Sequence, residues 1–279
     1  MAIHPTAIID PKAELHSTVQ IGPYVVIEGP VKIAADTQVR AHAYISGWTE
    51  IGERCDIHPL AVVGHFPQDF HHKGERSYTK IGNGVVIREA ATIHRGTQPE
   101  SSTVIGDECF LLTYSHVGHN CVLGRGVKVY NMVAVSGHVE IDDNAILSGY
   151  SLVHQFVRIG SLAFIAAATR VAMDVPPFMT AYGESTVIGH NVIGMRRAGY
   201  TAEEIHEIRQ AYRTLYRCGL PFTKAVDQLA ETMKTRAGHQ LLAFLRHDSR
   251  RGYCAAGTTS HRTRFQAETE EGPENEDPR

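Results

Sequence analysis

Large aliphatic residues recur at every sixth position of the chain from Ile3 to Val171. In this phase, 26 of the 29 positions are Ile, Leu or Val, and only Asp69, Glu75 and Pro99 interrupt the series. A period of six fits neither the 3.6-residue turn of a helix nor the alternation of a long strand. The pattern therefore predicts a solenoid of short strands and turns.

Three hexads per turn form a triangular coil of about 18 residues, in which each aliphatic residue points inward and stacks on its equivalents above and below. We therefore expect an all-β solenoid, a left-handed parallel β-helix, over residues 1–173, followed by α-helices. Successive coils should lie about 4.8 Å apart. Glycines that directly follow an inward residue suit the tight corners: Gly22, Gly52, Gly82, Gly106 and Gly124.

The interruptions fall in two polar stretches, residues 64–80 and 97–104, that are typical of loops thrown out from a repeat. The six-residue phase resumes after each stretch. Each loop therefore replaces whole repeat units.

A second module follows the repeat. Pro176 and Pro177 predict that the chain leaves the solenoid there, because a regular coil cannot continue through them. Thr201 and Glu204 form a capping box ahead of an amphipathic helix of about 16 residues, and Pro221 opens a second helical stretch. We expect a linker and helical cap over residues 174–249 and a disordered, acidic tail over residues 250–279.

Charge and cysteine content narrow the class of protein. The formal net charge of −3, from 27 basic and 30 acidic side chains, predicts no nucleic-acid partner, since phosphate binding needs a basic field. The five cysteines form no CxxC pair, which argues against disulfides and a structural zinc site and favours a reducing cytosol. The chain shows neither a signal peptide nor the roughly 20 apolar residues that span a bilayer. We therefore expect a cytoplasmic protein.

One column of the solenoid carries the candidate chemistry. His119, Gly137 and Gln155 each follow an inward aliphatic residue by two positions and therefore stack, with His138 and His154 beside them. This side of the solenoid carries a band of imidazoles.

The loop at residues 64–80 leaves the solenoid at the same phase and can fold along this face as a lid. His116 is expected on the corner that precedes the column. His94 is expected on a different face of its own subunit, so that it meets the band only across an interface with a neighbouring copy in a threefold assembly. The polar residues of the lid are His65, Gln68, Asp69, His71 and His72.

Two kinds of chemistry remain open for this band. A neutral imidazole at His119 or His138 can take a proton from a hydroxyl and pass it on as a general base. Alternatively, three imidazoles from two subunits can hold zinc with one open position, as in the hexapeptide-repeat carbonic anhydrases.

Five motifs resemble a known family: IREAATIHRGT (87–97), SHVGHNCVLG (115–124), VSGHVEID (135–142), LVHQFVRIG (152–160) and DVPPF (174–178). They are similar to the cytosolic UDP-N-acetylglucosamine O-acyltransferases of lipid A biosynthesis, and the resemblance runs to about residue 220. It implies a homotrimer that moves a (3R)-hydroxyacyl chain from acyl carrier protein to the 3-hydroxyl of UDP-N-acetylglucosamine. It implies no metal and no cofactor beyond the donor's phosphopantetheine thioester.

The resemblance also implies roles for individual residues. His119 matches the catalytic base, and the backbone N–H of Gly137 matches the oxyanion donor. Asn191 and Arg197 match positions that contact the nucleotide, and Ala167 matches the position that measures acyl length. The remaining matches line the substrate cleft: Gln68, Asp69, His71, His94, His116, His138, His154 and Gln155.

Several positions depart from the family pattern. His71 stands where the family usually has lysine, Ile193 replaces a usual glutamate, and Ala198 replaces the second arginine of a usual KRRG. Asn120 stands where some relatives have aspartate. These departures leave open an N-acyltransferase that acts on a UDP-3-amino-sugar. Candidates for docking an acidic carrier protein are Arg196, Arg197, Arg209, Arg213, Arg217 and Lys224.

Overall fold

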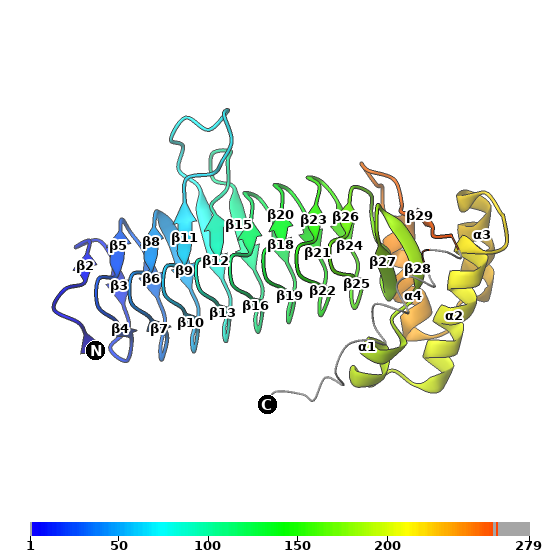
Figure 1. Ribbon diagram of the computed structural model, residues 1–279, viewed down its shortest axis with the longest axis horizontal. Helices are drawn as coiled ribbons and strands as arrows, with labels where there is room; N and C mark the ends of the chain where they lie inside the picture. Colours follow the sequence, from blue (N-terminus) through cyan, green and yellow to red (C-terminus); the bar gives the residue numbers. More distant parts are fainter. Residues whose placement is uncertain (1, 259–260, 262–279) are drawn as a thin grey trace.

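The computed structural model describes residues 2–258 and residue 261. Strands β1 to β26 wind into a long triangular solenoid, with the helices gathered at its C-terminal end (Figure 1). Neighbouring strands within each face come from successive coils and run parallel. The predicted left-handed parallel β-helix is confirmed.

The three faces are named A, B and C. Face A holds β1 (Ala2–Ile3), β4 (Gln20–Ile21), β7 (Gln38–Val39), β10 (Asp56–Ile57), β13 (Val86–Ile87), β16 (Phe110–Leu111), β19 (Lys128–Val129), β22 (Ile146–Leu147) and β25 (Phe164–Ile165). Face B holds β2 (Ile8–Ile9), β5 (Val26–Glu28), β8 (Tyr44–Ser46), β11 (Val62–His65), β14 (Thr92–His94), β17 (His116–Val117), β20 (Ala134–Val135), β23 (Leu152–Val153) and β26 (Arg170–Val171). Face C holds β3 (Glu14–Leu15), β6 (Lys32–Ile33), β9 (Trp48–Ile51), β12 (Tyr78–Ile81), β15 (Ser102–Ile105), β18 (Val122–Leu123), β21 (Glu140–Ile141) and β24 (Arg158–Ile159).

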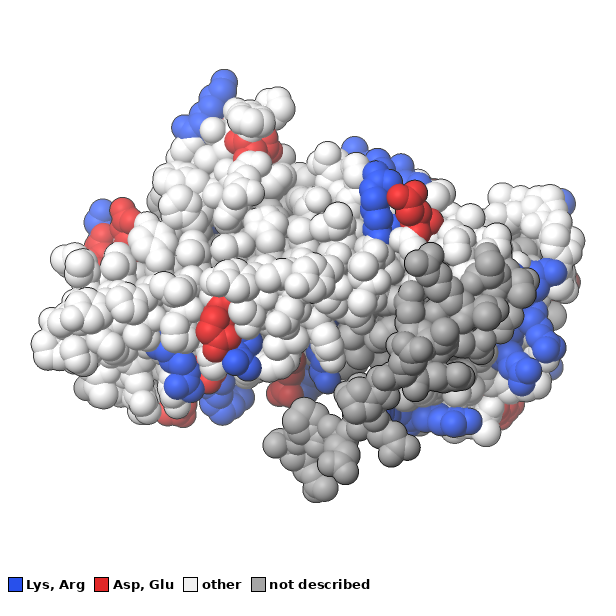
Figure 2. Space-filling view, viewed as in Figure 1, with Lys and Arg blue, Asp and Glu red and all other residues white. Residues whose placement is uncertain are grey.

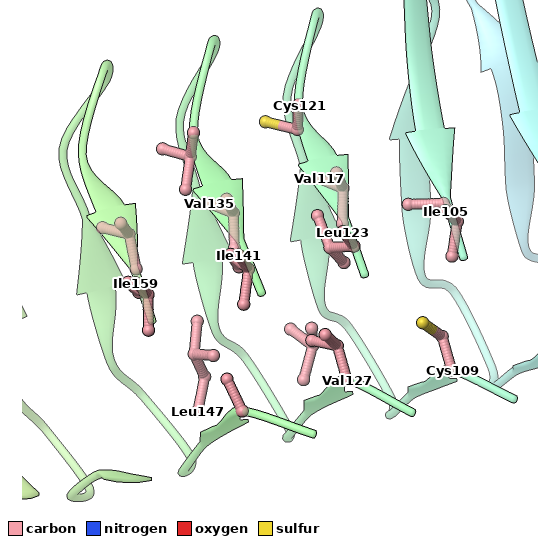
Figure 3. Packing of buried hydrophobic residues seen from close by; sticks show 14 of the residues in the cluster. Ile105, Cys109, Val117, Cys121, Leu123, Val127, Val135, Ile141, Leu147 and Ile159 are labelled. Atoms are coloured by element: carbon pink, nitrogen blue, oxygen red, sulfur yellow. The ribbon is translucent and has the colours of Figure 1, made fainter. Parts of the chain in front are cut away.

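Each hexad contributes two inward side chains rather than one. Besides the large aliphatic residue, the position two residues before it is buried and holds a small or β-branched side chain. Cys55, Cys109 and Cys121 occupy this second position, and each is at most 1% exposed. Figure 3 shows Cys109 and Cys121 packed beside the inward Leu and Val side chains. Three of the five cysteines are therefore packing residues, and all five are free.

The corners depend on left-handed backbone at non-glycine residues. The third residue after the inward aliphatic has φ near +60° at coil after coil, including Asn120, His138 and Phe156. The predicted corner glycines have a different role. A Cβ on Gly52 would lie 2.5 Å from the carbonyl oxygen of Gly82 in the next coil, so glycine there permits close approach of two coils.

Both loops insert whole hexads. In a regular coil the pairing step is three hexads, as from Val117 to Val135. Across the first loop Val63 pairs with Ile93, a step of five hexads, and across the second Ile93 pairs with Val117, a step of four hexads. The insertions are therefore two hexads and one hexad long, and the inward phase is kept.

The solenoid ends later than the prolines predict. Val175 bridges Ile159, and β27 (Met179–Tyr182) pairs in parallel with β25 before turning back into antiparallel β28 (Thr186–His190). Pro177 fits because it packs against Gly160, where a Cβ would meet the proline nitrogen at 2.3 Å.

The helical cap follows as α1 (Val192–Arg197), α2 (Ala202–Tyr216), α3 (Phe222–Thr232) and α4 (Arg236–Arg246). The predicted capping box of α2 is present, with Thr201 accepting from the N–H of Glu204 and Glu204 accepting from the N–H of Thr201. Within the described residues, no helix has the length and apolar character that crossing a membrane requires.

The tail prediction is wrong at its start. Residues Ala255–Ala256 form β29, which pairs with β28, and Cys254 is 2% exposed. The ring of Tyr253 stacks on Phe222 at 4.6 Å. These contacts with the cap supply the burial that the local composition lacks. Residues 259–260 and 262–279 of the predicted tail lie outside the described residues.

We predict that the second inward position tolerates no large side chain. Ala145 is fully buried in this position, so Ala145→Leu should overpack the coil and lower the free energy of unfolding by about 1–3 kcal/mol. The midpoint of urea unfolding, followed by circular dichroism, measures the effect. Ala134→Leu is the matched control, since Ala134 lies outward on β20 and is only partly buried. Equal stability of the two variants would contradict the prediction.

Candidate active site

His119 lies at the corner between faces B and C, here called the BC corner. It follows the inward Val117 of β17 by two residues, so the chain has already turned outward. Asn120, in the left-handed conformation, donates its N–H to Thr103 Oγ1 at 2.8 Å and holds the turn. The His119 side chain is 14% exposed. The imidazole is thus sheltered but reachable.

Gly137 lies directly against this imidazole. A Cβ on Gly137 would stand 2.5 Å from Cε1 and 2.6 Å from Nε2 of His119, so only glycine leaves room for the ring. Within the described residues, the N–H of Gly137 makes no hydrogen bond with protein. The predicted stacking of His119, Gly137 and Gln155 is confirmed by the pairing of Val117 with Val135 and of Val135 with Val153.

Asn120 fixes the tautomer of His119. Its Oδ1 accepts the backbone N–H of Thr97 at 3.0 Å, so the oxygen of the side-chain amide, not the nitrogen, faces Thr97. The same Oδ1 lies 3.0 Å from Nδ1 of His119. Nδ1 must therefore carry the ring proton and donate it, because two acceptors cannot bond. The lone pair of His119 is left on Nε2, beside Gly137.

Asp69 approaches His119 from the lid loop. Its Oδ2 lies 3.8 Å from His119 Nε2, while Oδ1 accepts from the N–H of His71 at 2.9 Å and lies 3.0 Å from His71 Nδ1. The backbone hydrogen bond from His71 lowers the pKa of Asp69, so the carboxylate is ionised at neutral pH. The prediction that this loop folds toward the histidine column is confirmed.

His94 and His116 contradict the predicted placement. Both lie on face B of the same chain, His94 in β14 and His116 in β17, with their rings 5.0 Å apart. The step of four hexads from Ile93 to Val117 includes one inserted hexad that lies outside the winding. Counting hexads along the sequence therefore assigns His94 and His116 to different faces, although they share one face. His94 therefore needs no neighbouring copy to reach the band. We call His94, His116, His119 and His138 the histidine band.

Three imidazoles of the band are neutral at physiological pH. Burial lowers the pKa of His94 to about 4. Burial likewise lowers the pKa of His116 and of His138, and repulsion from His119 in its protonated form adds to both effects. His116 Nδ1 also lies 2.7 Å from the hydroxyl of Thr92, which fixes the ring.

Phe156 is a site residue that the hexad pattern does not reveal. It occupies the left-handed position of the BC corner, one coil after His138, and the two rings stack at 4.8 Å. The ring of His138 meets that of His119 edge to face at 5.1 Å. The outward position of Phe156 within its hexad conceals its contact with the band.

The base of the lid loop is held by a buried arginine that sequence reasoning also missed. Arg95 is 5% exposed, and its guanidinium lies 4.1 Å from the ring of Phe66 and 5.7 Å from that of Trp48. His72, further along the loop, lies with Nδ1 3.1 Å from the carbonyl oxygen of Thr97. The lid loop thus contacts Thr97, the residue whose N–H orients Asn120.

Other predicted site residues lie away from His119. Asn191 caps α1, accepting from the N–H of Gly194 and donating to the carbonyl of Leu162. Arg197 is exposed in the last turn of that helix. Ala167 is exposed at the corner between faces A and B, named the AB corner. None of these three contacts the histidine band within the described chain.

The other cleft residues divide between the loop and the next coil. Gln68 and Gln155 are exposed, and His154 Nδ1 lies 3.2 Å from the carbonyl oxygen of Gln155. Within the residues that the structure describes, no group of three or more His, Cys, Asp or Glu side chains is arranged to hold a metal ion.

A base with its lone pair beside an unpaired backbone N–H can deprotonate a hydroxyl and stabilise the oxyanion that forms on an attacked carbonyl. On a hexapeptide-repeat β-helix, this pair defines the class: the protein is an acyltransferase.

Comparisons with known proteins give the family. Residues 174–254 match the family described as UDP N-acetylglucosamine O-acyltransferase, domain 2, and residues 102–137 match the bacterial transferase hexapeptide repeats. A relative from Stutzerimonas stutzeri, named acyl-(acyl-carrier-protein)–UDP-N-acetylglucosamine O-acyltransferase, is 43% identical over 232 residues, which cover 82% of this chain and 90% of the relative. A relative of the same name from Thermodesulfovibrio yellowstonii is 40% identical, covering 83% and 90%.

The fold agrees with this family. The crystal structure of a UDP-N-acetylglucosamine acyltransferase from Francisella novicida superposes with a TM-score of 0.88 at 37% identity, covering 92% of this chain and 95% of that one. This chain belongs to the UDP-N-acetylglucosamine O-acyltransferase family.

We predict that Gly137→Ala displaces the His119 ring and lowers kcat for acyl transfer about 100-fold, since an error of about 1 Å in a reacting group has this effect. Steady-state kinetics measure it. Gly189→Ala is the control, because a Cβ added to Gly189 in β28 would meet no atom within 4 Å. Similar activity of both variants would show that the ring is not confined by Gly137.

Proposed function

We propose that this protein transfers a (3R)-hydroxyacyl chain from acyl carrier protein to the 3-hydroxyl of UDP-N-acetylglucosamine, the first step of lipid A biosynthesis. The observation that carries the proposal is the position of His119 Nε2, which is free to accept a proton and lies against Gly137. The N–H of Gly137 has no acceptor among the described residues. The names of the relatives supply the two substrates.

The reaction uses one base for both proton transfers. His119 Nε2 takes the proton of the sugar hydroxyl as the oxygen attacks the thioester carbonyl, and the resulting oxyanion is stabilised by the N–H of Gly137. Collapse of the tetrahedral intermediate breaks the carbon–sulfur bond. The thiolate of phosphopantetheine then takes the proton from the imidazolium, which returns His119 to its starting state.

Neighbouring groups tune this base. Asn120 holds Nδ1–H, and Asp69 stabilises the imidazolium through its negative charge at 3.8 Å. Because Asn120 is neutral, Asp69 is the charged partner of His119. The neutral histidines of the band, together with Gln68, His71, His154 and Gln155, offer hydrogen bonds to hydroxyls and amides along the cleft.

The nucleotide is bound from another copy of the chain. Asn191 and Arg197 lie away from His119 in their own chain, so they complete the site of a neighbour. The guanidinium of Arg197 suits a diphosphate. Ile193, 64% exposed, and Ala198 flank it without charge. Ala167 likewise lies away from His119 in its own chain, so it limits acyl length in the cleft of a neighbouring copy. Its methyl group shortens the acyl-binding tunnel there relative to glycine.

A homotrimer is supported by an apolar ridge on the AB corner. The left-handed residue of each coil stacks there, with the N–H of Tyr150 bonding the carbonyl of Asn131 and the N–H of Met132 bonding that of Thr113. Its exposed members are Tyr24 (57%), Leu60 (58%), Tyr114 (60%), Met132 (44%) and Tyr150 (64%). Face C instead carries ion pairs such as Lys32–Glu14 and suits solvent. A ridge made mostly of large exposed apolar side chains, with His42 and Ala90 between them, marks a protein interface.

We predict that the protein sediments at three times its 30.7 kDa chain mass and that the double variant Tyr114→Glu/Tyr150→Glu sediments at the mass of one chain. The added carboxylates would be buried unpaired in the interface. Val122→Glu is the control, because Val122 is 45% exposed on face C. A trimeric double variant would place the interface elsewhere.

The acyl carrier protein is proposed to dock on the cap. Arg196, Arg209, Arg213 and Lys224 are exposed there, and Figure 2 shows basic side chains along the cap. Arg217 is less suited, because it bonds Tyr212 Oη and the carbonyl of Gly257. A cytoplasmic location is proposed, in keeping with five free cysteines.

The test of the function is a panel of (3R)-hydroxyacyl carrier proteins offered with UDP-N-acetylglucosamine or its 3-amino analogue, with products identified by mass. We expect transfer to the 3-hydroxyl, and His119→Ala should remain a trimer yet lose nearly all turnover. Transfer only to the amine would assign the protein to the alternative reaction, an N-acyltransfer. Full activity of His119→Ala would remove His119 as the base.

A further inference from the structure

The segment after α4 is fixed against the last coil of the solenoid. Gly252 accepts the N–H of Asp174 through its carbonyl at 2.8 Å, and Cys254 donates to the carbonyl of Asp174 at 2.9 Å. Arg251 Nε donates to the carbonyl of Ala172 at 3.1 Å. These bonds bring the preceding residue, Arg250, to the BC corner.

Arg250 continues the line of rings that begins at His119. Its guanidinium lies 4.3 Å from the centre of the Phe156 ring, which stacks on His138, which in turn contacts His119. Arg250 therefore lies roughly three coil spacings, about 14 Å, from the base along the corner. Its charge also contributes to the lowered pKa of His138, after burial and the charge of His119.

The cation has no anionic partner in the described chain. No described carboxylate forms an ion pair with Arg250, and its side chain is exposed. Arg170 in β26 and Arg251 lie on the same stretch of the solenoid, since Arg251 bonds Ala172, two positions after Arg170. Figure 2 shows basic side chains gathered around β26, with acidic side-chain atoms beside them. A guanidinium that rests on an aromatic face keeps its N–H edge free for a phosphate.

The two ends of the corner differ in charge. Asp69 lies at the His119 end and Arg250 at the far end. Two substrates whose reacting groups meet at His119 and Gly137 must extend away from this point in different directions. A carboxylate suits sugar hydroxyls and repels phosphate, whereas a free guanidinium attracts it.

We propose that Arg250 binds the phosphodiester of the donor's 4′-phosphopantetheine arm, with the arm lying along His138 and Phe156. This proposal rests on the proposed function and names the donor contact of the same site. The ring of Phe156 supports the guanidinium of Arg250 at the position proposed for the phosphodiester.

The test separates the phosphate from the rest of the donor. Arg250→Gln and the parent enzyme are assayed with a (3R)-hydroxyacyl-4′-phosphopantetheine and with the same acyl-pantetheine, which lacks the phosphate. The parent should prefer the phosphorylated donor, and Arg250→Gln should raise its KM roughly 10-fold or more, the size expected for a lost charged hydrogen bond. The KM values for acyl-pantetheine and for UDP-N-acetylglucosamine should stay within about twofold of the parent.

Arg246→Gln is the matched control, an exposed arginine in the last turn of α4 that should leave all three KM values unchanged. Equal losses with both donors would overturn the proposal, as would a parent that does not distinguish them. A rise only in the KM for the UDP-sugar would overturn it too and assign Arg250 to the nucleotide diphosphate. A parent enzyme that is inactive with the (3R)-hydroxyacyl carrier protein as well would instead reject the proposed function on which this inference rests.

Discussion

The hydrogen bonds between successive coils are the constraint on which the rest of this structure depends. Each coil donates its backbone N–H groups to carbonyls of the next, as Gly118 does to Val135 at 2.8 Å, and this repeats along faces A, B and C. The ladder sets the spacing between His119 and Gly137 without any side chain that holds them apart. The geometry of the active site is therefore a property of the backbone, and the side chains supply only the chemistry.

The fold was largely predictable because the aliphatic period reports the inward direction directly. The stacking of His119 under Gly137 followed from that period, since residues one coil apart share a corner. The face of His94 did not follow, because a loop that replaces a whole hexad leaves the phase intact while changing the face. The second inward position, with its three cysteines, was also hidden, because small residues carry no strong periodic signal.

The side-chain contacts around the column of His119, Gly137 and Gln155 were harder to predict from the sequence. The role of Asn120 depends on the backbone N–H of Thr97, which a loop brings from the preceding coil. Arg95 and Phe156 act through aromatic faces on other coils. The order of residues 250–258 depends on pairing with β28 and on packing against α3, both remote in sequence. Such contacts are tertiary, and local composition does not report them.

The insertions of two hexads and one hexad have an evolutionary consequence. Inside the winding, a change that is not a whole number of hexads would turn the inward side chains of every later coil outward. Moreover, a change of one or two hexads moves each later hexad to another face, unless the loop is left outside the winding as it is here. Lineages can therefore remodel the lid freely only by bulging it outward. A lid outside the winding can take any length, because the phase of the later coils depends only on where the chain re-enters the solenoid.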